Sequence, residues 1–289
     1  MSVLLPAGLP AIDILAKEGI RLDRGGTDGR RLRVALLNLM PLKIEAEADI
    51  VRALAASERS VDLCLLKLRS HVSTHVSVEH MSRFYRFFDE VASESIDGLI
   101  VNGAPVEELP FEGVDYWDEL CRVFDWARER VASSLYICWG AQAALHARYG
   151  LEKFKLEWKR FGIYRERALM PGHPIMKGLG QEFWMPHSRH TEIRRNDVLA
   201  CDDLTLLADG EESGISIIVR NDNREYYVTG HLEYGIDRLD WEYRRDRDVR
   251  SDVKMPDHYY RDDNVDGEIM YRWQNSANVF FANWLETCI

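Results

Sequence analysis

Three side chains in this sequence have the types and spacing needed for nucleophilic catalysis: Cys138, His231 and Glu233. Cys138 closes an apolar run at residues 134–138, and a Trp-Gly pair and an Ala-rich segment follow it. This pattern predicts a sharp turn from a buried strand into a helix, with the thiol at its tip beside the N–H groups of the helix N-terminus. The alternative for this stretch alone is a small, inert buried cysteine.

His231 and Glu233 are of the types that a thiol nucleophile needs as partners. His231 follows an apolar run at residues 226–230, and Glu233 comes two residues later. Because side chains alternate along an extended segment, both point to the same side. An imidazole base held by a carboxylate is the arrangement that activates a thiol. We therefore predict a Cys-His-Glu triad, with the backbone amides of Trp139 and Ala104 as oxyanion donors.

Charge and composition argue against several function classes. The 289 residues include 37 Lys and Arg against 48 Asp and Glu, which gives a net charge of −11. This balance argues against a nucleic acid or an anionic membrane as partner. No apolar stretch approaches the roughly 20 residues of a membrane span, and the N-terminus lacks a secretory signal pattern. We expect a soluble, cytoplasmic protein.

The cysteines and histidines do not predict a metal site. The five Cys lack CxxC pairing, so neither a disulfide framework nor a zinc site is expected. His71 and His75 are four residues apart, but their segment has no apolar helical face and no third ligand nearby. We expect a solvated loop there, because short motif matches often mislead.

Apolar and amphipathic segments alternate along the first half of the chain. Strands are expected at residues 32–39, 61–68, 97–101 and 134–138, and helices at residues 44–56, 80–91, 115–133 and 139–149. This alternation predicts an α/β fold with a doubly wound, mostly parallel, flavodoxin-like sheet. In such a sheet, ligands bind outside the carboxyl ends of the strands.

We expect one domain over residues 1–289. Residues 1–31 are expected to form an N-terminal arm, which includes a Gly-rich charged loop at residues 24–31. Residues 151–212 are expected to form an elaboration on the sheet edge, with short β pieces and turns. The later expected elements are paired strands at residues 214–220 and 224–229, a charged helix with a solvated face at residues 237–250, and an apolar helix at residues 273–289.

Five groups of motifs are specific in combination. They are Leu37-Asn38-Leu39-Met40-Pro41 with Lys43-Ile44-Glu45, Gly103-Ala104-Pro105 with Asp115-Tyr116-Trp117, Cys138-Trp139 with Gln142-Ala143-Ala144-Leu145, Pro186-His187-Ser188-Arg189, and Val228-Thr229-Gly230-His231 with Glu233-Tyr234. Over nearly its whole length the chain thereby resembles the homoserine O-acyltransferase family of methionine biosynthesis. The resemblance implies a class I glutamine amidotransferase-like fold and a homodimer. The chain departs from the family pattern at Leu232, usually Pro, and at Gly235, usually Asp.

The resemblance implies a ping-pong acyl transfer. Cys138 attacks the thioester of acetyl-CoA and is acetylated, and CoA leaves. The hydroxyl of L-homoserine, deprotonated by His231 while Glu233 orients the base, then collects the acetyl group. Acetyl-CoA is thus a co-substrate, and no cofactor or metal is implied.

Further residues match family positions that select the substrates. Arg245 matches the Arg that binds the amino-acid carboxylate, a task that suits a guanidinium fork; otherwise it is one more charge on an exposed helix face. Lys159 and Ser188 match positions that line the acceptor and acyl pocket, and Lys43 falls in a matching motif. Glu107 stands where acetyl users carry Glu and succinyl users carry Gly.

The carboxylate of Glu107 therefore predicts acetyl-CoA as the donor. It repels the distal carboxylate of succinyl-CoA and fills the space which that group needs. The alternative is a solvated loop acid beside Glu108. Other functions remain open on the same scaffold: a homoserine O-succinyltransferase, an L-serine O-acetyltransferase, a Cys-His-Glu amidohydrolase or glutamine amidotransferase-like hydrolase, and a catalytically silent binder.

Overall fold

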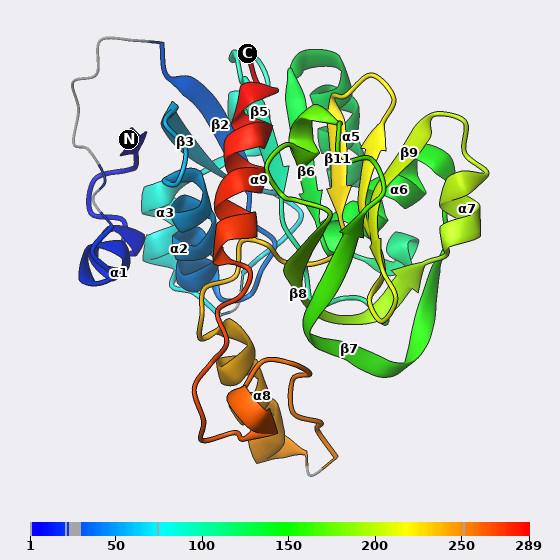
Figure 1. Cartoon of the computed structure of the whole chain (residues 1–289). Helices are drawn as coiled ribbons and strands as arrows, with labels where there is room; N and C mark the ends of the chain where they lie inside the picture. The colour runs from blue at the N-terminus through cyan, green and yellow to red at the C-terminus, as the bar shows by residue number, and fades with distance from the viewer. Residues whose placement is uncertain (1, 21, 23–29, 74, 251) are drawn as a thin grey trace.

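A computed structural model of the chain describes residues 2–20, 22, 30–73, 75–250 and 252–289 (Figure 1). In these ranges eleven strands form one sheet in the order β1-β3-β2-β5-β6-β11-β10-β9-β7-β8, with β4 paired to β3. The strands are β1 (Ser2–Leu4), β2 (Leu32–Leu37), β3 (Ser60–Lys67), β4 (Tyr85–Phe87), β5 (Gly98–Val101), β6 (Ser133–Ile137), β7 (Lys153–Ala168), β8 (Glu182–Ile193), β9 (Leu204–Gly210), β10 (Gly214–Arg220) and β11 (Glu225–Val228). The α-helices are α1 (Ala11–Lys17), α2 (Lys43–Leu54), α3 (Val78–Phe84), α4 (Phe88–Val91), α5 (Trp117–Arg130), α6 (Trp139–Tyr149), α7 (Arg195–Leu199), α8 (Arg238–Val249) and α9 (Gln274–Glu286).

The predicted doubly wound, mostly parallel sheet is confirmed. β3, β2, β5, β6 and β11 run parallel and lie side by side in that order, the arrangement of flavodoxin-like sheets. Leu37 is in register with Val101, and Ile137 with Val228. The segments that follow β2, β5, β6 and β11 therefore leave the sheet at one shared carboxyl edge, the edge that carries Cys138.

Alternating side chains of the central strands belong to two separate cores. Val34 and Leu36 of β2 pack in one cluster with residues of α1, α2 and α9, whereas Ala35 and Leu37 pack in another with residues of α4, α5 and α6. All four side chains are fully buried or nearly so. Figure 1 shows α9 lying across one face of the sheet. Because both faces are covered, the strands read as continuous apolar runs.

The strands in residues 151–212 are longer than the sequence analysis predicted. This segment supplies β7, β8, α7 and β9, which lie at the sheet edge beyond β10. However, β7 has 16 residues and β8 has 12, so the expectation of short β pieces is wrong. The first half of β7 carries exposed charged residues and pairs antiparallel with β8. A strand that is solvated in this way lacks the apolar run of a buried strand.

The helix expected at residues 80–91 is interrupted. β4 separates α3 from α4 and pairs parallel with β3, with Tyr85 opposite Leu65. Tyr85 is buried, and its hydroxyl donates a hydrogen bond to Glu47 of α2 at 2.6 Å. Aromatic side chains suit a strand as well as a helix, so tertiary pairing decides the conformation here.

The N-terminal segment lies at the other edge of the sheet. β1 pairs parallel with β3, and Ala11 and Leu15 of α1 pack into the core beside α2. The Gly-rich loop expected at residues 24–31 lies mainly outside the described residues. No helix in the described ranges has the length and apolar character that crossing a membrane requires.

Gly140 in the first turn of α6 lets the helix approach the end of β5. A Cβ at this position would lie 2.7 Å from the Asn102 carbonyl oxygen and 2.8 Å from that of Val101. We expect Gly140→Ala to lower the free energy of unfolding by about 1–3 kcal/mol, because the backbone must shift to make room. Urea denaturation followed by circular dichroism measures this loss.

Gly172→Ala is the matched control, because a Cβ at Gly172 meets nothing within 4 Å. Equal stability of the two variants would contradict the close approach of α6 to β5.

Candidate active site

The thiol of Cys138 stands on a strained turn between β6 and α6. Cys138 has φ 52° and ψ −119°, a backbone conformation that non-glycine residues rarely adopt and that concentrates at functional sites. Its N–H donates to the Val228 carbonyl oxygen at 2.7 Å, which ties the turn to β11. The predicted strand-to-helix elbow is confirmed, and Cys138 is only 4% exposed.

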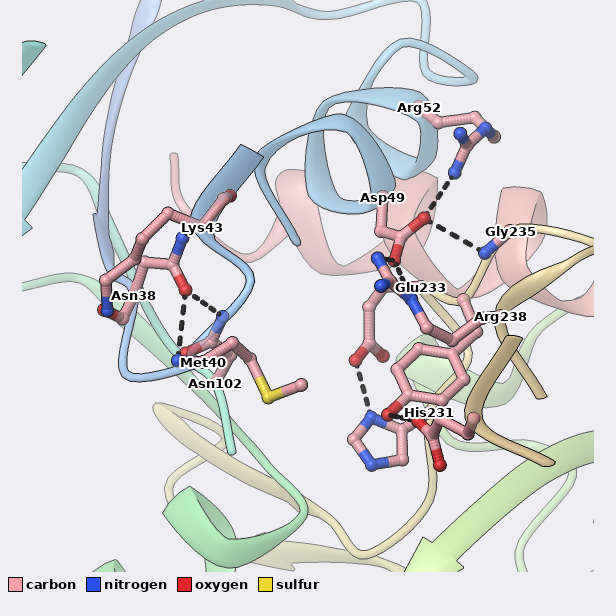
Figure 2. Close-up of polar contacts among 12 residues, drawn as sticks. Asn38, Met40, Lys43, Asp49, Arg52, Asn102, His231, Glu233, Gly235 and Arg238 are labelled. Atoms are coloured by element: carbon pink, nitrogen blue, oxygen red, sulfur yellow. Dashed lines mark hydrogen bonds and ion pairs between the residues drawn. The ribbon is translucent and has the colours of Figure 1, made fainter. Parts of the chain in front are cut away.

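His231 and Glu233 lie in the segment that follows β11, the strand beside β6. His231 Nδ1 is 2.7 Å from Glu233 Oε1 (Figure 2), and the imidazole also interacts with the Cys138 side chain. Since Nδ1 faces the carboxylate, Nε2 is the nitrogen left for the thiol. The structure thus brings together the three residues that the sequence proposed as a triad.

The imidazole of His231 is placed to carry a positive charge. Burial lowers its pKa, but the negative charges of Cys138 and Glu233 and their hydrogen bonds outweigh this effect and raise the pKa well above its usual value. The ring stacks on Tyr234 with centroids 4.0 Å apart. The His231 N–H donates to the Pro186 carbonyl oxygen at 2.8 Å. These contacts hold the ring in one orientation.

The loop after β5 lies against the thiol. A Cβ at Gly103 would lie 3.3 Å from Cys138 Cβ and 3.7 Å from the Trp139 nitrogen, and Ala104 is buried. The Trp139 amide is the first of α6, so it belongs to the N–H groups that a helix leaves unpaired. The two amides that the sequence proposed as oxyanion donors therefore come from segments that meet at Cys138.

Glu107 faces the thiol rather than solvent. Its Oε1 is 3.9 Å from Cys138 Sγ, and its Oε2 accepts a hydrogen bond from the His190 N–H at 2.5 Å. Burial raises the pKa of this carboxyl, although the His190 amide and the charges of Arg189 and His231 act in the opposite direction. The interpretation of Glu107 as a solvated loop acid is wrong.

Glu242 of α8 is a site residue that the sequence analysis missed. It is 7% exposed, and its Oε2 accepts a hydrogen bond from Ser188 Oγ at 2.5 Å and lies 3.4 Å from Lys159 Nζ. Its Oε1 accepts a hydrogen bond at 3.1 Å from Tyr234, the residue stacked on His231. The helix thus has a solvated face, as expected, but Glu242 lies on its buried face. The available signal was the spacing of Glu242 from Leu239, because both lie on the buried face of α8.

Arg245 lies farther out than the triad. Its side chain is 47% exposed and pairs with Asp246, with Nε to Oδ1 at 2.6 Å. Arg245, Lys159 and His190 line one cleft of about 600 Å³. The structure therefore joins Arg245 to Lys159 around a common cleft, but not to the thiol.

Lys43 is buried under the carboxyl edge. Its Nζ donates to the Asn38 carbonyl oxygen at 2.6 Å. Asn38 Oδ1 accepts a hydrogen bond from Asn102 at 2.8 Å (Figure 2). The Asn102 carboxamide oxygen accepts one from the Leu39 N–H at 2.6 Å. Desolvation lowers the Lys43 pKa to about 8, even though Glu47 raises it. Lys43 thus braces the loops that follow β2 and β5.

The described residues contain no group of three or more His, Cys, Asp or Glu side chains that could hold a metal ion. His71 packs edge-on against Tyr116, with ring centroids 4.8 Å apart. A ligand set around His71 and His75 is therefore not found in the described part of the chain.

Comparison with solved structures shows the fold. A glutamine amidotransferase from Thermotoga maritima superposes with a TM-score of 0.57 over 90% of this chain and 99% of its own, at 11% identity. A glutamine amidotransferase from Methylobacillus flagellatus gives a TM-score of 0.52 over 89% of this chain and 94% of its own, at 13% identity. The expected class I glutamine amidotransferase-like architecture is confirmed.

Comparison of sequences shows the family. Similar proteins include the homoserine O-acetyltransferase of Bacteroides fragilis, 46% identical over 99% of this chain and 95% of its own length. The homoserine O-acetyltransferase of Bacillus cereus is 40% identical over 99% of this chain and 96% of its own. A family model described as homoserine O-succinyltransferase matches residues 2–289. The chain therefore belongs to the homoserine O-succinyltransferase family.

Proposed function

We propose that this protein transfers an acetyl group from acetyl-CoA to the hydroxyl of L-homoserine, a step of methionine biosynthesis, through an acetylated Cys138. The observation that carries this proposal is one thiol placed beside two groups. These are the His231 imidazole, whose orientation Glu233 fixes at 2.7 Å, and the Glu107 carboxylate at 3.9 Å from the sulfur. His231 with Glu233 supplies an activated nucleophile, and Glu107 limits the acyl group that it can accept.

In the first half-reaction the Cys138 thiolate attacks the carbonyl carbon of the thioester. The developing oxyanion accepts hydrogen bonds from the backbone amides of Trp139 and Ala104. When the carbon–sulfur bond to CoA breaks, the His231 imidazolium gives its proton to the departing CoA sulfur. The enzyme is left with an acetylated thiol and a neutral imidazole that Glu233 still orients.

In the second half-reaction His231 takes the proton of the homoserine hydroxyl as its oxygen attacks the thioester carbon. Collapse of the tetrahedral intermediate breaks the bond to Cys138 and releases O-acetylhomoserine. The thiolate and imidazolium are then restored as a pair. The acyl group arrives activated as a thioester, so the protein's own side chains suffice and the reaction needs no cofactor.

The two ends of the zwitterionic acceptor need opposite charges. Glu242 supplies a buried carboxylate for the ammonium group, beside Ser188 and Lys159. Arg245, which lines the same cleft as Lys159, supplies a guanidinium for the carboxylate. The hydroxyl of homoserine is one methylene farther from the ammonium and carboxylate than that of serine. Because the cleft lies outside the thiol, this longer reach favours homoserine over serine. A homodimer and a cytoplasmic location remain predictions.

Exposure to acetyl-CoA without acceptor should leave one acetyl group on the protein, an increase of about 42 Da by intact-protein mass spectrometry, because hydrolysis by water is slower than attack by a bound alcohol. Cys138→Ala is the control and should stay unmodified. L-Homoserine should discharge the adduct faster than L-serine does. Full acetylation of Cys138→Ala would contradict the mechanism. Release of ammonia from glutamine, without CoA release from acetyl-CoA, would instead identify a hydrolase.

Glu107→Gly should shift the ratio of kcat/KM for succinyl-CoA to that for acetyl-CoA by about tenfold or more toward succinyl-CoA. The substitution removes like-charge repulsion and opens space beside the thiol. Release of free CoA measures both rates. Because burial raises the pKa of Glu107, lowering the pH neutralises the carboxyl and should shift the wild-type ratio in the same direction.

The matched control for this prediction is Glu108→Gly, which removes an exposed carboxylate paired with Lys155 at 2.7 Å. This variant should keep the wild-type ratio. A Glu107→Gly variant with an unchanged ratio would contradict the assignment of Glu107 as the acyl selector.

Glu233→Gln should slow the alkylation of Cys138 by iodoacetamide at pH 7 by about tenfold. Glu233 raises the pKa of His231, and without its charge the imidazolium that stabilises the thiolate forms less readily. Loss of unmodified protein, followed by mass spectrometry, gives the rate. Glu129→Gln on the exposed face of α5 is the control. An alkylation rate equal to that of wild type would rule out the proposed role of Glu233.

A further inference from the structure

Asp49 of α2 is a buried carboxylate that faces the segment after Glu233. It is 4% exposed. Its Oδ1 accepts hydrogen bonds from the Gly235 N–H at 3.1 Å and from Arg52 at 2.7 Å. Its Oδ2 accepts two hydrogen bonds from Arg238, from Nε at 3.0 Å and from the terminal nitrogen at 2.5 Å. Figure 2 shows Asp49 between these three partners.

The partners of Asp49 mark the two ends of a short connection. Gly235 follows Tyr234, the residue that stacks on His231, and Arg238 is the first residue of α8. Residues 233–238 therefore link the carboxylate that orients the base to the helix that carries Glu242. Trp273 also holds this connection, by donating from Nε1 to the Tyr234 carbonyl oxygen at 2.8 Å. A shift of the connection would move both Glu233 and Glu242.

Space at position 235 supports the same interpretation. Gly235 has no positive φ, so its backbone conformation would accept a side chain. However, a Cβ there would lie 3.1 Å from Asp49 Oδ1 and 3.0 Å from an Arg52 terminal nitrogen. Asp49 and Arg52 thus fill the space that a side chain of residue 235 would use. The glycine permits the carboxylate of α2 to reach the backbone of the connection.

We propose that Asp49 is a positioning residue for the acyl transfer. By binding the Gly235 amide and the Arg238 guanidinium, it holds the connection so that Glu233 stays on His231 and Glu242 stays on Ser188 and Lys159. This inference rests on the proposed function for its substrates. It goes beyond that function by assigning a role to a residue that contacts neither substrate nor thiol.

Asp49→Asn is the direct test, because it removes the charge and keeps the size of the side chain. We expect acetylation of Cys138 by acetyl-CoA, and its discharge by homoserine, each to slow by about tenfold or more, since small misplacements of catalytic groups have large effects on rate. Alkylation of Cys138 by iodoacetamide as a function of pH gives a second readout, which needs no substrate. Its midpoint should move to higher pH, because a loosened Glu233 stabilises the imidazolium less.

The titratable and charged side chains that interact with the thiol or the imidazole are Glu233, Glu107, Arg189, His187 and Tyr234. Asp49→Asn substitutes none of them. A merely structural role of Asp49 would lower the melting temperature without moving the alkylation midpoint. Wild-type rates and midpoint in folded Asp49→Asn protein would overturn the proposal. Failure of wild-type protein to accept acetyl would refute the proposed function instead, while the alkylation profile would still test Asp49.

Further variants sharpen the result. Glu18→Gln is the matched control, because Glu18 pairs with Arg52 at 2.7 Å on its exposed side; it should behave as wild type. Gly235→Ala keeps every charge but places a methyl group against the Asp49 carboxylate. It should therefore move the pH midpoint of Cys138 alkylation upward, by less than Asp49→Asn does. If Asp49→Asn does not fold, Gly235→Ala provides the test in its place. Asp49→Ala vacates part of the space beside residue 235, so adding Gly235→Asp to Asp49→Ala should recover part of the rate that Asp49→Ala loses, because it returns a carboxylate to Arg52 and Arg238. The proposal would also be overturned if the double variant recovered no rate and Gly235→Ala left the alkylation midpoint unchanged.

Discussion

The structure depends on burying a thiol, an imidazole and a carboxylate in contact with one another. Cys138, His231 and Glu233 are between 2% and 7% exposed, and a buried charge is tolerated only when it is paired and hydrogen-bonded. The imidazolium meets this condition because it lies between two negative groups, which raise its pKa despite desolvation. The low polarity of the buried surroundings also strengthens the interactions of the imidazole with Cys138 and Glu233.

This pairing requires that distant segments end at one place. Cys138 follows β6 and His231 follows β11, which are parallel neighbours in register. The Cys138 N–H is bound to the last residue of β11. A parallel sheet therefore provides the alignment, because the carboxyl ends of its strands meet at a common edge. The Asn38–Asn102 contact joins the neighbouring loops after β2 and β5, so the loop that carries Gly103 is fixed to the same edge.

Two carboxylates outside the triad lie at this edge of the sheet. Glu107 lies 3.9 Å from the thiol and comes from the loop after β5. Glu242 of α8 accepts a hydrogen bond from Tyr234, whose ring stacks on His231. α8 is otherwise highly charged and exposed, yet one of its acids lies at the centre of the hydrogen bonds to Ser188 and Lys159. Among the many acidic residues of this protein, Glu107 and Glu242 are distinguished by where their carboxylates lie.

The sequence alone determined the local features of the protein. The apolar run before Cys138, the Gly and Ala after it and the spacing of His231 and Glu233 follow from short-range rules, and they predicted the elbow and the pairing of base and carboxylate. The alternation of buried strands and helices predicted the sheet, because covered strands are apolar along their whole length. Glu107 and the residues of the acceptor pocket came from the resemblance to a family.

Only the tertiary structure decided which polar residues are buried. Glu242 lies in a charge run whose pattern is that of a solvated helix, and it is buried because α8 packs against Phe161 and Tyr234. Asp49 lies on α2, 186 residues from its partner Gly235, and no local pattern links them. β4 and the long strands β7 and β8 depend on pairing with neighbours, a contribution that periodicity does not contain. Long-range contacts of this kind are set by packing, so the sequence read in short windows could not reveal them.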